Sequence, residues 1–388
     1  MILLWAATLL AAICVVIIVV RVAIFSHLCP RLVLADEISN APLISVIVPA
    51  RNEAANIERC VRSLLKQSYP NFEIIVVDDG SADATPEILA RLAAESSRLR
   101  VAIGRPLPSG WLGKPYAVYQ GVQCARGDWL LFVDADVMLH PSVLSSAYRA
   151  AEDNQAALIS LWVRQELGTR WERIVQPVIV GLNHAVDPFQ RSSSPRHPDA
   201  VCANGQFMLV ERQAYDQVGG HMAVRNELVE DQKLSWHFKH AGYRVLMLDG
   251  TWGVSTRMYT SLRGIWEGWS KSNFLMLGRS YLVVLAAILT TYIVTVSPAV
   301  LFICALLLHT SGDQASRLLL INLLLIIAPL VTRWRMRKYF PTPLSDYLWN
   351  PIGGLIFIGI ILNSAYWHTC QRGVVWKGRR YRDVDSVA

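Results

Sequence analysis

The sequence has few charged residues. Only 17% of its 388 residues are Asp, Glu, Lys or Arg, whereas a soluble globular domain carries about 25%. Hydrophobic residues make up 53% of the chain, which excludes a disordered protein and a fully soluble one. The apolar runs lie at Met1–Val20, Tyr281–Leu308, Leu318–Thr332 and Ile352–Trp367. The sequence therefore predicts a membrane anchor, a globular domain and a second membrane region.

Cysteine pairs at metal-binding spacing are also missing. The seven cysteines are scattered, and no two of them form a CxxC pair, so neither a disulfide framework nor a zinc site is indicated. This usage fits the reducing cytosol. The net charge of +7 could suggest binding to nucleic acid, but the sequence contains no motif that reads a nucleic-acid groove. Several basic residues flank the apolar runs, and we assign them to anionic lipid head groups, with no nucleic-acid partner.

The first apolar run is long enough to span a bilayer, which takes about 20 residues. A cleaved signal peptide is the alternative, but no charged residue precedes the run and the run is too long. Basic residues follow it at Arg21 and Arg31, and others follow the third run at 333–338. By the positive-inside rule, both signals place the globular domain in the cytoplasm, at the inner membrane of a multi-pass protein.

The last apolar run leaves two arrangements open. If residues 352–367 cross the bilayer, the basic tail lies outside, against the positive-inside rule. A re-entrant or interfacial segment, which three glycines in this short run favour, keeps the tail inside. We therefore expect an anchor over 1–25, a globular domain over 42–258, an amphipathic interfacial helix over 259–280, transmembrane or re-entrant helices over 281–370, and a basic tail over 371–388.

The globular stretch alternates between strand and helix patterns. Short, apolar, β-branched runs, typical of buried parallel strands, occur at Leu43–Pro49, Phe72–Val77, Val101–Gly104 and Trp129–Val133. Stretches with helical spacing separate them. This alternation predicts an α/β domain with a Rossmann-like, mostly parallel sheet.

Polar residues follow three of these strands, at 49–53, 78–81 and 134–136. Ligands of open α/β sheets bind beyond the carboxyl ends of the strands, so these carboxylates are expected to meet in one crevice, where they would repel each other. A divalent cation with a bound diphosphate removes the repulsion, because Mg²⁺ or Mn²⁺ prefers carboxylate and phosphate oxygens. The alternative is that each Asp caps a helix or a turn.

Four motifs in this order resemble family 2 glycosyltransferases: VIVPARNE (Val46–Glu53), VVDDGS (Val76–Ser81), FVDADV (Phe132–Val137) and the pair Glu230-Asp231. The family consists of inverting enzymes with the GT-A fold. Two shorter motifs, PLPSGWLGKPYA (106–117) and GVVWKGRRY (373–381), are similar to the membrane subgroup of hopene-associated glycosyltransferases, near the ceramide and carotenoid glucosyltransferases.

The resemblance implies a nucleotide pocket for a UDP-sugar. Asp78 and Asp79 would hold its uracil and ribose. Glu53 and the backbone of Pro49 and Ala50 would line the same pocket.

The resemblance also implies the reacting groups. Asp134 and Asp136 match the DxD motif, which binds ribose and a metal-bound diphosphate. Lys114 would neutralise phosphate, and Asp231 matches the general base, with Glu230 as its orienter or a mere neighbour. In glycosyl transfer a carboxylate accepts the proton of the attacking hydroxyl, while metal and lysine stabilise the leaving diphosphate. The alternative reading of the Glu-Asp pair is a helix N-terminus favoured by its dipole.

The acceptor side is less well defined. Asn204, Gly205 and Gln206 fall where the subgroup has an acceptor-facing strand, and a polar turn is the equal alternative. Trp266 and Trp269 lie on an apolar stripe that suits the level of lipid head groups.

Other features of the second half carry weaker expectations. A helical pattern over Trp171–Val186 packs either on the core or on the membrane. Lone histidines, such as His221, lack metal-ligand spacing, and we expect surface or structural roles for them.

These features predict a membrane-bound, inverting glycosyltransferase that moves a sugar from a UDP-sugar to a lipid hydroxyl at the cytoplasmic face. A hopanoid or another polyisoprenoid-type lipid is the expected acceptor. A processive polysaccharide synthase is one alternative, but it needs more spans for a polymer channel. A non-catalytic GT-A module that binds nucleotide or lipid is the other.

Overall fold

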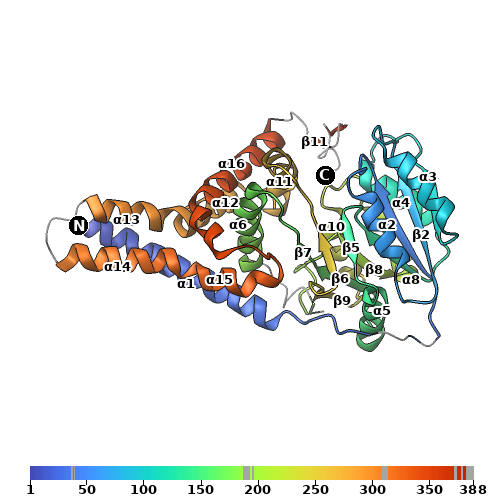
Figure 1. Cartoon of the computed structure of the whole chain (residues 1–388), viewed down its shortest axis with the longest axis horizontal. Coiled ribbons are helices and arrows are strands. Elements are labelled where there is room, and N and C mark those ends of the chain that lie inside the picture. The colour runs from blue at the N-terminus through green and yellow to red at the C-terminus, as the bar shows by residue number, and fades with distance from the viewer. Residues whose placement is uncertain are drawn as a thin grey trace. The chain divides into compact units, whose positions relative to one another are not determined.

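The computed structural model describes residues 1–35, 38, 40–186, 193–194, 196–307, 313–370, 374–376 and 379–381 (Figure 1). The chain forms two compact units, which we describe separately. The sheet unit comprises Cys29–Glu166 and Pro188–Met258. The helical unit comprises Met1–Leu28, Leu167–Asp187 and Tyr259–Asp383.

A seven-stranded sheet in the order β3-β2-β1-β4-β8-β6-β9 forms the centre of the sheet unit. β8 is antiparallel to both of its neighbours, and the other adjacent pairs are parallel. The strands are β1 (Ile44–Ala50), β2 (Phe72–Asp78), β3 (Leu99–Ile103), β4 (Trp129–Val133), β6 (Leu158–Trp162), β8 (Phe207–Glu211) and β9 (Val245–Asp249). The predicted α/β fold with a mostly parallel sheet is confirmed.

Helices cover both faces of this sheet, because its central strands alternate apolar side chains between the two sides. Val46 and Val48 of β1 pack in one cluster with α2 (Ile57–Leu65), α3 (Thr85–Glu95) and α5 (Val143–Asn154). Ile47 points to the other face, toward α4 (Gly113–Cys124), α8 (Arg212–Gln217) and α10 (Glu230–His240). The short helix α9 (Gly220–Ala223) follows α8.

Gly121 lets α4 approach the sheet closely. A Cβ atom at this position would lie 2.5 Å from Cγ2 of Ile47 and 3.2 Å from Cγ2 of Val77, which is closer than side-chain carbons pack. The close contact fixes the position of the helix whose first turn carries Lys114. A small second sheet, in the order β5-β10-β7, consists of β5 (Val137–Leu139), β10 (Val254–Thr256) and β7 (Arg164–Gln165).

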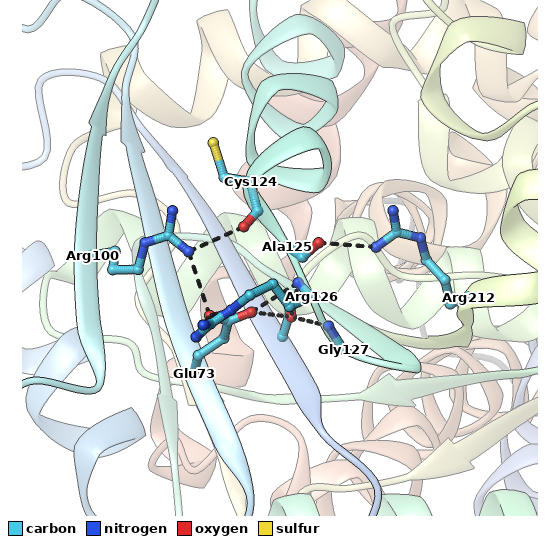
Figure 2. Close-up of polar contacts among 8 residues, drawn as sticks. Glu73, Arg100, Cys124, Ala125, Arg126, Gly127 and Arg212 are labelled. Atoms are coloured by element: carbon cyan, nitrogen blue, oxygen red, sulfur yellow. Dashed lines mark hydrogen bonds and ion pairs between the residues drawn. The ribbon is translucent and has the colours of Figure 1, made fainter.

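A charged network holds the amino-terminal edge of the large sheet (Figure 2). The carboxylate of Glu73, near the start of β2, is buried and accepts hydrogen bonds from Ser45 Oγ at 2.8 Å and from the backbone N–H of Arg126 at 2.9 Å. The Arg126 guanidinium also donates to it, at 2.8 and 3.1 Å, and Arg100 approaches it to 3.6 Å. This network ties β2 to the loop that precedes β4.

The helical unit contains four helical segments that are long and apolar enough to cross a membrane, judged by length and composition among the described residues. They are Ile2–Leu28, Tyr281–Leu307, Asp313–Lys338 and Leu344–Thr369. The first is α1 (Ile2–Leu28). The others consist of α12 (Tyr281–Thr291), the π-helical turn η1 (Tyr292–Val296), α13 (Ser297–Leu307), α14 (Asp313–Ile327), α15 (Pro329–Arg335), the 3₁₀ turns η2 (Met336–Lys338) and η3 (Leu344–Trp349), and α16 (Asn350–Thr369). Within this unit, α1, α13 and α14 lie side by side (Figure 1).

Two amphipathic helices belong to the same unit. α6 (Arg170–Val186) and α11 (Leu262–Met276) pack against α16. Their shared apolar cluster includes Ile174, Val178, Ile265 and Phe357. The apolar stripe of residues 171–186, for which sequence left two positions open, therefore packs on helices of the helical unit rather than in the core of the sheet unit.

The last part of the chain contains a two-stranded hairpin of β11 (Val374–Trp376) and β12 (Arg379–Tyr381). The remainder of the basic tail predicted over 371–388 lies outside the described residues. The last apolar run is part of a helical segment of 26 residues, so it is longer than its sequence pattern suggested. Whether it crosses or re-enters the membrane stays a prediction, as do the domain boundaries.

Candidate active site

Lys114 is the centre of a group of charges at the carboxyl edge of the large sheet. Its Nζ atom lies 2.8 Å from Oδ1 of Asp134 and 2.9 Å from Oε1 of Glu230. Three elements meet here: Lys114 comes from the first turn of α4, Asp134 follows β4 directly, and Glu230 begins α10. Burial alone would lower the pKa of the Lys114 ammonium, but the two carboxylates outweigh it and raise that pKa well above its usual value. The lysine is therefore fully protonated.

Asp231 lies beside this lysine and is held by backbone donors. Its Oδ2 accepts a hydrogen bond from the N–H of Gly205 at 2.8 Å, and its Oδ1 accepts one from the N–H of Gln232 at 2.8 Å. Loss of hydration and the neighbouring charge of Glu230 raise the pKa of Asp231 to about 6, against the lowering effect of Lys114. A carboxylate with this pKa is ionised at pH 7 and takes up a proton readily, as a general base must.

Gly205 fits closely between the reacting groups. A Cβ atom there would lie 3.2 Å from both Asp231 Oδ2 and Lys114 Nζ. The neighbouring side chains hold the turn: Asn204 Nδ2 donates to Leu161 O at 3.1 Å and to Gln206 Oε1 at 3.2 Å. The polar turn that sequence offered as an alternative is thus present, and its central N–H points at Asp231.

A small cavity of about 10 Å³ joins these groups. Of the residues singled out from sequence, its wall contains Pro49, Lys114, Asp134, Gly205, Glu230 and Asp231. Such a volume holds about one water molecule, because the ion pairs of Lys114 draw the surrounding carboxylates together.

The other predicted nucleotide-binding residues lie outside that cavity, along the same edge of the sheet. Ala50, the last residue of β1, pairs in register with Asp78, the last residue of β2. Asp78 Oδ1 accepts the N–H of Ser81 at 3.0 Å, and the N–H of Asp79 donates to Ala50 O at 2.8 Å. Glu53 accepts a hydrogen bond from Asn56 Nδ2 at 3.0 Å. These contacts shape the turns that follow β1 and β2, so the side chains of Asp78 and Glu53 have a structural role whether or not they bind a nucleotide.

Asp134 and Asp136 are the candidate metal ligands. Among the described residues, no group of three or more His, Cys, Asp or Glu side chains is placed to hold a metal ion. A site with two carboxylates fits a cation that completes its shell with substrate phosphates and water, which is how Mg²⁺ is usually bound. The donor chemistry of this pair therefore suits Mg²⁺ or Mn²⁺ bound together with a diphosphate.

His221 lines the same cavity, although sequence gave it only a structural role. It is buried, its ring lies edge-on to Phe132, and its Nδ1 lies 2.9 Å from the hydroxyl of Tyr215. Burial lowers its pKa to about 4, so the ring is neutral. Its position depends on how the chain between β8 and α10 folds against β4, and no spacing in the sequence shows this.

Trp266 and Trp269 lie on α11 of the helical unit. Both are partly buried and border the apolar cluster shared with α6 and α16. They belong to a different unit from the charged cavity, so the structure leaves their acceptor role a prediction.

The family model named "Glycosyl transferase family 2" matches residues 45–219, from β1 through β8. This segment of the chain is therefore similar to glycosyltransferase family 2 domains. The match includes the strand-end motifs with Asp78, Asp79, Asp134 and Asp136, and the predicted recognition is thereby confirmed. The Glu230-Asp231 pair follows the matched range.

Curated relatives of this chain are named 4,4'-diaponeurosporenoate glycosyltransferase. The one from Staphylococcus haemolyticus (strain JCSC1435) is 29% identical over 231 residues, which are 59% of this chain and 60% of that protein. The one from Staphylococcus aureus (strain MRSA252) is 26% identical over 365 residues, which are 88% of this chain and 89% of that protein. Several matches thus span less than two thirds of the relatives' own length.

A solved structure has the same fold. The mannosyltransferase PcManGT from Pyrobaculum calidifontis, in complex with GDP-Man and Mn²⁺, superposes with a TM-score of 0.52 at 18% sequence identity. The superposition covers 91% of this chain and 97% of that one. The likeness shows the fold, and with it the predicted GT-A class is confirmed.

Proposed function

We propose that this protein is a membrane-bound glycosyltransferase that moves a sugar from a nucleotide sugar to a lipid acceptor. The observation that carries the proposal is Asp231, a carboxylate with a raised pKa that is held by the Gly205 N–H beside the Lys114–Asp134 ion pair. A family 2 domain and relatives named for a diaponeurosporenoate acceptor support it. Four apolar helical segments support a lipid setting.

The donor we propose is a UDP-sugar, bound at the carboxyl edge of β1, β2 and β4. Asp78, Asp79 and Glu53 would contact the nucleoside with the backbone of Pro49 and Ala50. Asp134 and Asp136 would hold a divalent cation, which supplies positive charge to the diphosphate when bound. The structure of PcManGT, which contains GDP-Man and Mn²⁺, supports a nucleotide-sugar donor bound with a divalent metal.

In the proposed reaction, Asp231 accepts the proton of the acceptor hydroxyl as its oxygen forms a bond to the anomeric carbon. The bond between that carbon and the diphosphate oxygen breaks at the same time, and the nucleotide leaves with the electron pair. Lys114 stabilises the charge on the diphosphate, as a preorganised cation does. Attack from the face opposite the leaving group inverts the anomeric centre.

The acceptor we propose is a hydroxyl of a hopanoid or another polyisoprenoid-type lipid, used at the cytoplasmic face of the inner membrane. The relatives' printed acceptor is a carotenoid-type lipid, which supports an extended apolar acceptor. A processive synthase would need a channel for its polymer. The four candidate segments found among the described residues support single transfers instead.

The test is nucleotide release by the full-length protein, purified in detergent. Reactions contain Mn²⁺ or Mg²⁺ and one member of a panel of UDP- and GDP-sugars, with and without polyisoprenoid lipid extract. We expect one UDP-sugar to give release that the extract stimulates, and a glycolipid whose anomeric configuration is opposite to that of the donor. Nucleotide binding without lipid-dependent turnover of any donor would favour the non-catalytic module. A ladder of polymer products would favour the synthase.

A further inference from the structure

The helical unit contains a cavity of about 70 Å³ that the proposed transfer reaction does not use. Its wall is supplied by α1, α6, η1, α15 and the turns up to the start of α16. About 10–15 Å³ accommodates one water molecule, so this cavity takes about five non-hydrogen atoms. That is room for a small head group or a short segment of one chain.

Gly181 of α6 lines this cavity. A Cβ atom built at this position would meet no heavy atom of the described residues within 4 Å. Glycine is unfavourable inside a helix by about 1 kcal/mol relative to alanine. Gly181 is thus a lining residue at which a larger side chain would have room at its Cβ.

Arg333 brings a positive charge to the same cavity, and the nearby carboxylate of Asp346, which it shares with Arg173, compensates it only in part. It is 6% exposed. Its Nε donates to Thr342 Oγ1 at 3.0 Å and its Nη2 to the backbone oxygen of Arg173 at 2.9 Å, so both partners are neutral. Among the described residues it forms no ion pair, and the nearby Asp346 pairs with Arg173 at 2.9 Å.

These contacts leave the group of two arginines and one aspartate with a net charge of +1. A buried charge without a counter-ion is strongly unfavourable. In a membrane segment such a residue marks a functional site by default. An anionic ligand beside Arg333 would supply the missing charge.

The position of Arg333 along its helix fits a lipid head group. The apolar segment ends at Lys338, five residues later, which is about 7–8 Å at the helical rise of 1.5 Å per residue. Exposed Trp334, Arg335 and Arg337 surround this end, as is typical of the membrane interface. Tyr347 and Asn350 add a hydroxyl and an amide group to the cavity wall, and both can donate to an anion.

We propose that this cavity binds the head-group phosphate of an anionic membrane lipid against Arg333. The guanidinium has unused N–H donors in a planar fork, a geometry that matches phosphate oxygens. The site is independent of the sugar-transfer site in the sheet unit.

The test measures thermal unfolding of the full-length protein in detergent with added lipid. Phosphatidylglycerol is compared with phosphatidylcholine carrying the same acyl chains, because the two differ in net head-group charge. A ligand of the folded state raises Tm as its concentration rises. We expect phosphatidylglycerol to raise Tm by at least about 2 °C, and phosphatidylcholine to have a smaller effect.

Three variants distinguish lipid binding in the cavity from an effect of the protein's overall charge. Arg333→Gln removes the proposed phosphate ligand. Arg335→Gln removes the same charge from an exposed position two residues away. Gly181→Leu keeps Arg333 and adds a side chain at the cavity wall. Its Cβ would meet no other heavy atom of the described residues within 4 Å, so this variant tests the site even if Arg333→Gln does not fold.

We expect the phosphatidylglycerol shift to be kept in Arg335→Gln and lost in Gly181→Leu and Arg333→Gln. A shift that Gly181→Leu or Arg333→Gln retains would overturn the proposal. Equal shifts with the two phospholipids would overturn it too, as would stabilisation by oleate without stabilisation by phosphatidylglycerol, which would assign the cavity to a carboxylate. Sugar transfer is not part of this readout, so the outcome is separate from that of the proposed function.

Discussion

Glu73 and Asp231 belong to charged groups at opposite ends of the same parallel strands, and the two groups are balanced in opposite ways. Glu73 is one carboxylate with two arginines, and it accepts hydrogen bonds from Ser45 and from Arg126 (Figure 2). Asp231 shares one lysine with Glu230 and Asp134. The first group has an excess of positive charge, and the second has an excess of negative charge.

The pKa shifts follow from this difference. Burial alone would raise the pKa of Glu73, but hydrogen bonds from Arg126 and Ser45 outweigh burial and lower it. The pKa of Asp231 is raised instead, because lost hydration and the charge of Glu230 outweigh Lys114. The negative charge of Glu73, which stabilises the fold, is thus fully compensated. The negative charge of Asp231, which is proposed to take up a proton, is only partly compensated. Strained electrostatics of this kind are typical of functional sites.

The largest effect is expected from Lys114→Met, which removes the cation paired with both Asp134 and Glu230. The proposed stabilisation of the leaving diphosphate is lost with it. We expect kcat/KM to fall by about 10²–10³-fold, the usual effect of removing one charge-stabilising group. Steady-state nucleotide release measures this. A fall of less than about threefold would remove Lys114 from the reaction.

Glu73→Gln is expected to act on stability instead. It leaves the donors from Arg126 without a carboxylate, and because Arg126 is largely exposed the loss is expected near about 2 kcal/mol. Urea unfolding of the variant measures this, at unchanged kcat per folded molecule. If Glu73→Gln reduced turnover without reducing stability, the assignment of the Glu73 group to stability and of the Asp231 group to catalysis would be wrong.

The pH dependence of the two groups should have opposite signs. Activity needs ionised Asp231, so kcat/KM is expected to fall about tenfold per pH unit below the raised pKa. Since that pKa is higher in the folded than in the unfolded chain, the Asp231 contribution to stability decreases as pH rises between the two values. Glu73 has a lowered pKa, so its contribution is present above the unfolded value and disappears as pH falls through the folded one.

Rate profiles and urea unfolding at several pH values measure both effects. Comparison of wild type with Glu73→Gln isolates the stability change at acid pH. An acid limb in kcat/KM that stays in place when Lys114 is replaced would argue against Asp231 as its source, because loss of the lysine charge should move that limb to higher pH.

The smallest effect is expected from Glu58→Gln, which breaks pairs to Arg62 and Arg91 on the surface of α2 and α3. Exposed pairs contribute about 0.2–1 kcal/mol. Urea unfolding should therefore separate Glu58→Gln from Glu73→Gln. Both carboxylates have two arginine partners, and Glu73 is the more buried of the two. Equal stability losses in the two variants would show that burial does not strengthen the interactions of Glu73.

Sequence predicted the fold and the edge where the site lies, since both depend on local pattern. Short β-branched runs such as Phe72–Val77 form the strands, and Asp78 and Asp134 come directly after them. Parallel strands then bring those ends together without further information. The Gly205 N–H contacts Asp231, which lies 26 positions away in the chain. The sequence predicted a polar turn at Gly205 as one of two alternatives, but not that its N–H would donate to Asp231.

Other features depended on tertiary packing and left no local signal. His221 reaches the cavity because α9 places its ring against Phe132. Glu73 finds its partner Arg126 53 residues away. In the sequence, Arg333 is one of several basic residues that follow an apolar run. Its burial follows from the packing of α6, which brings the backbone of Arg173 to its guanidinium.

The most direct measurement compares Asp231→Asn with Asp216→Asn, a control carboxylate that is 58% exposed and paired with Arg212 on α8. Both are assayed for lipid-stimulated nucleotide release and for nucleotide binding by calorimetry. We predict that Asp231→Asn loses at least about 100-fold in turnover and keeps its Kd for UDP, while Asp216→Asn keeps both. Turnover by Asp231→Asn within a few-fold of wild type would contradict its role as the general base.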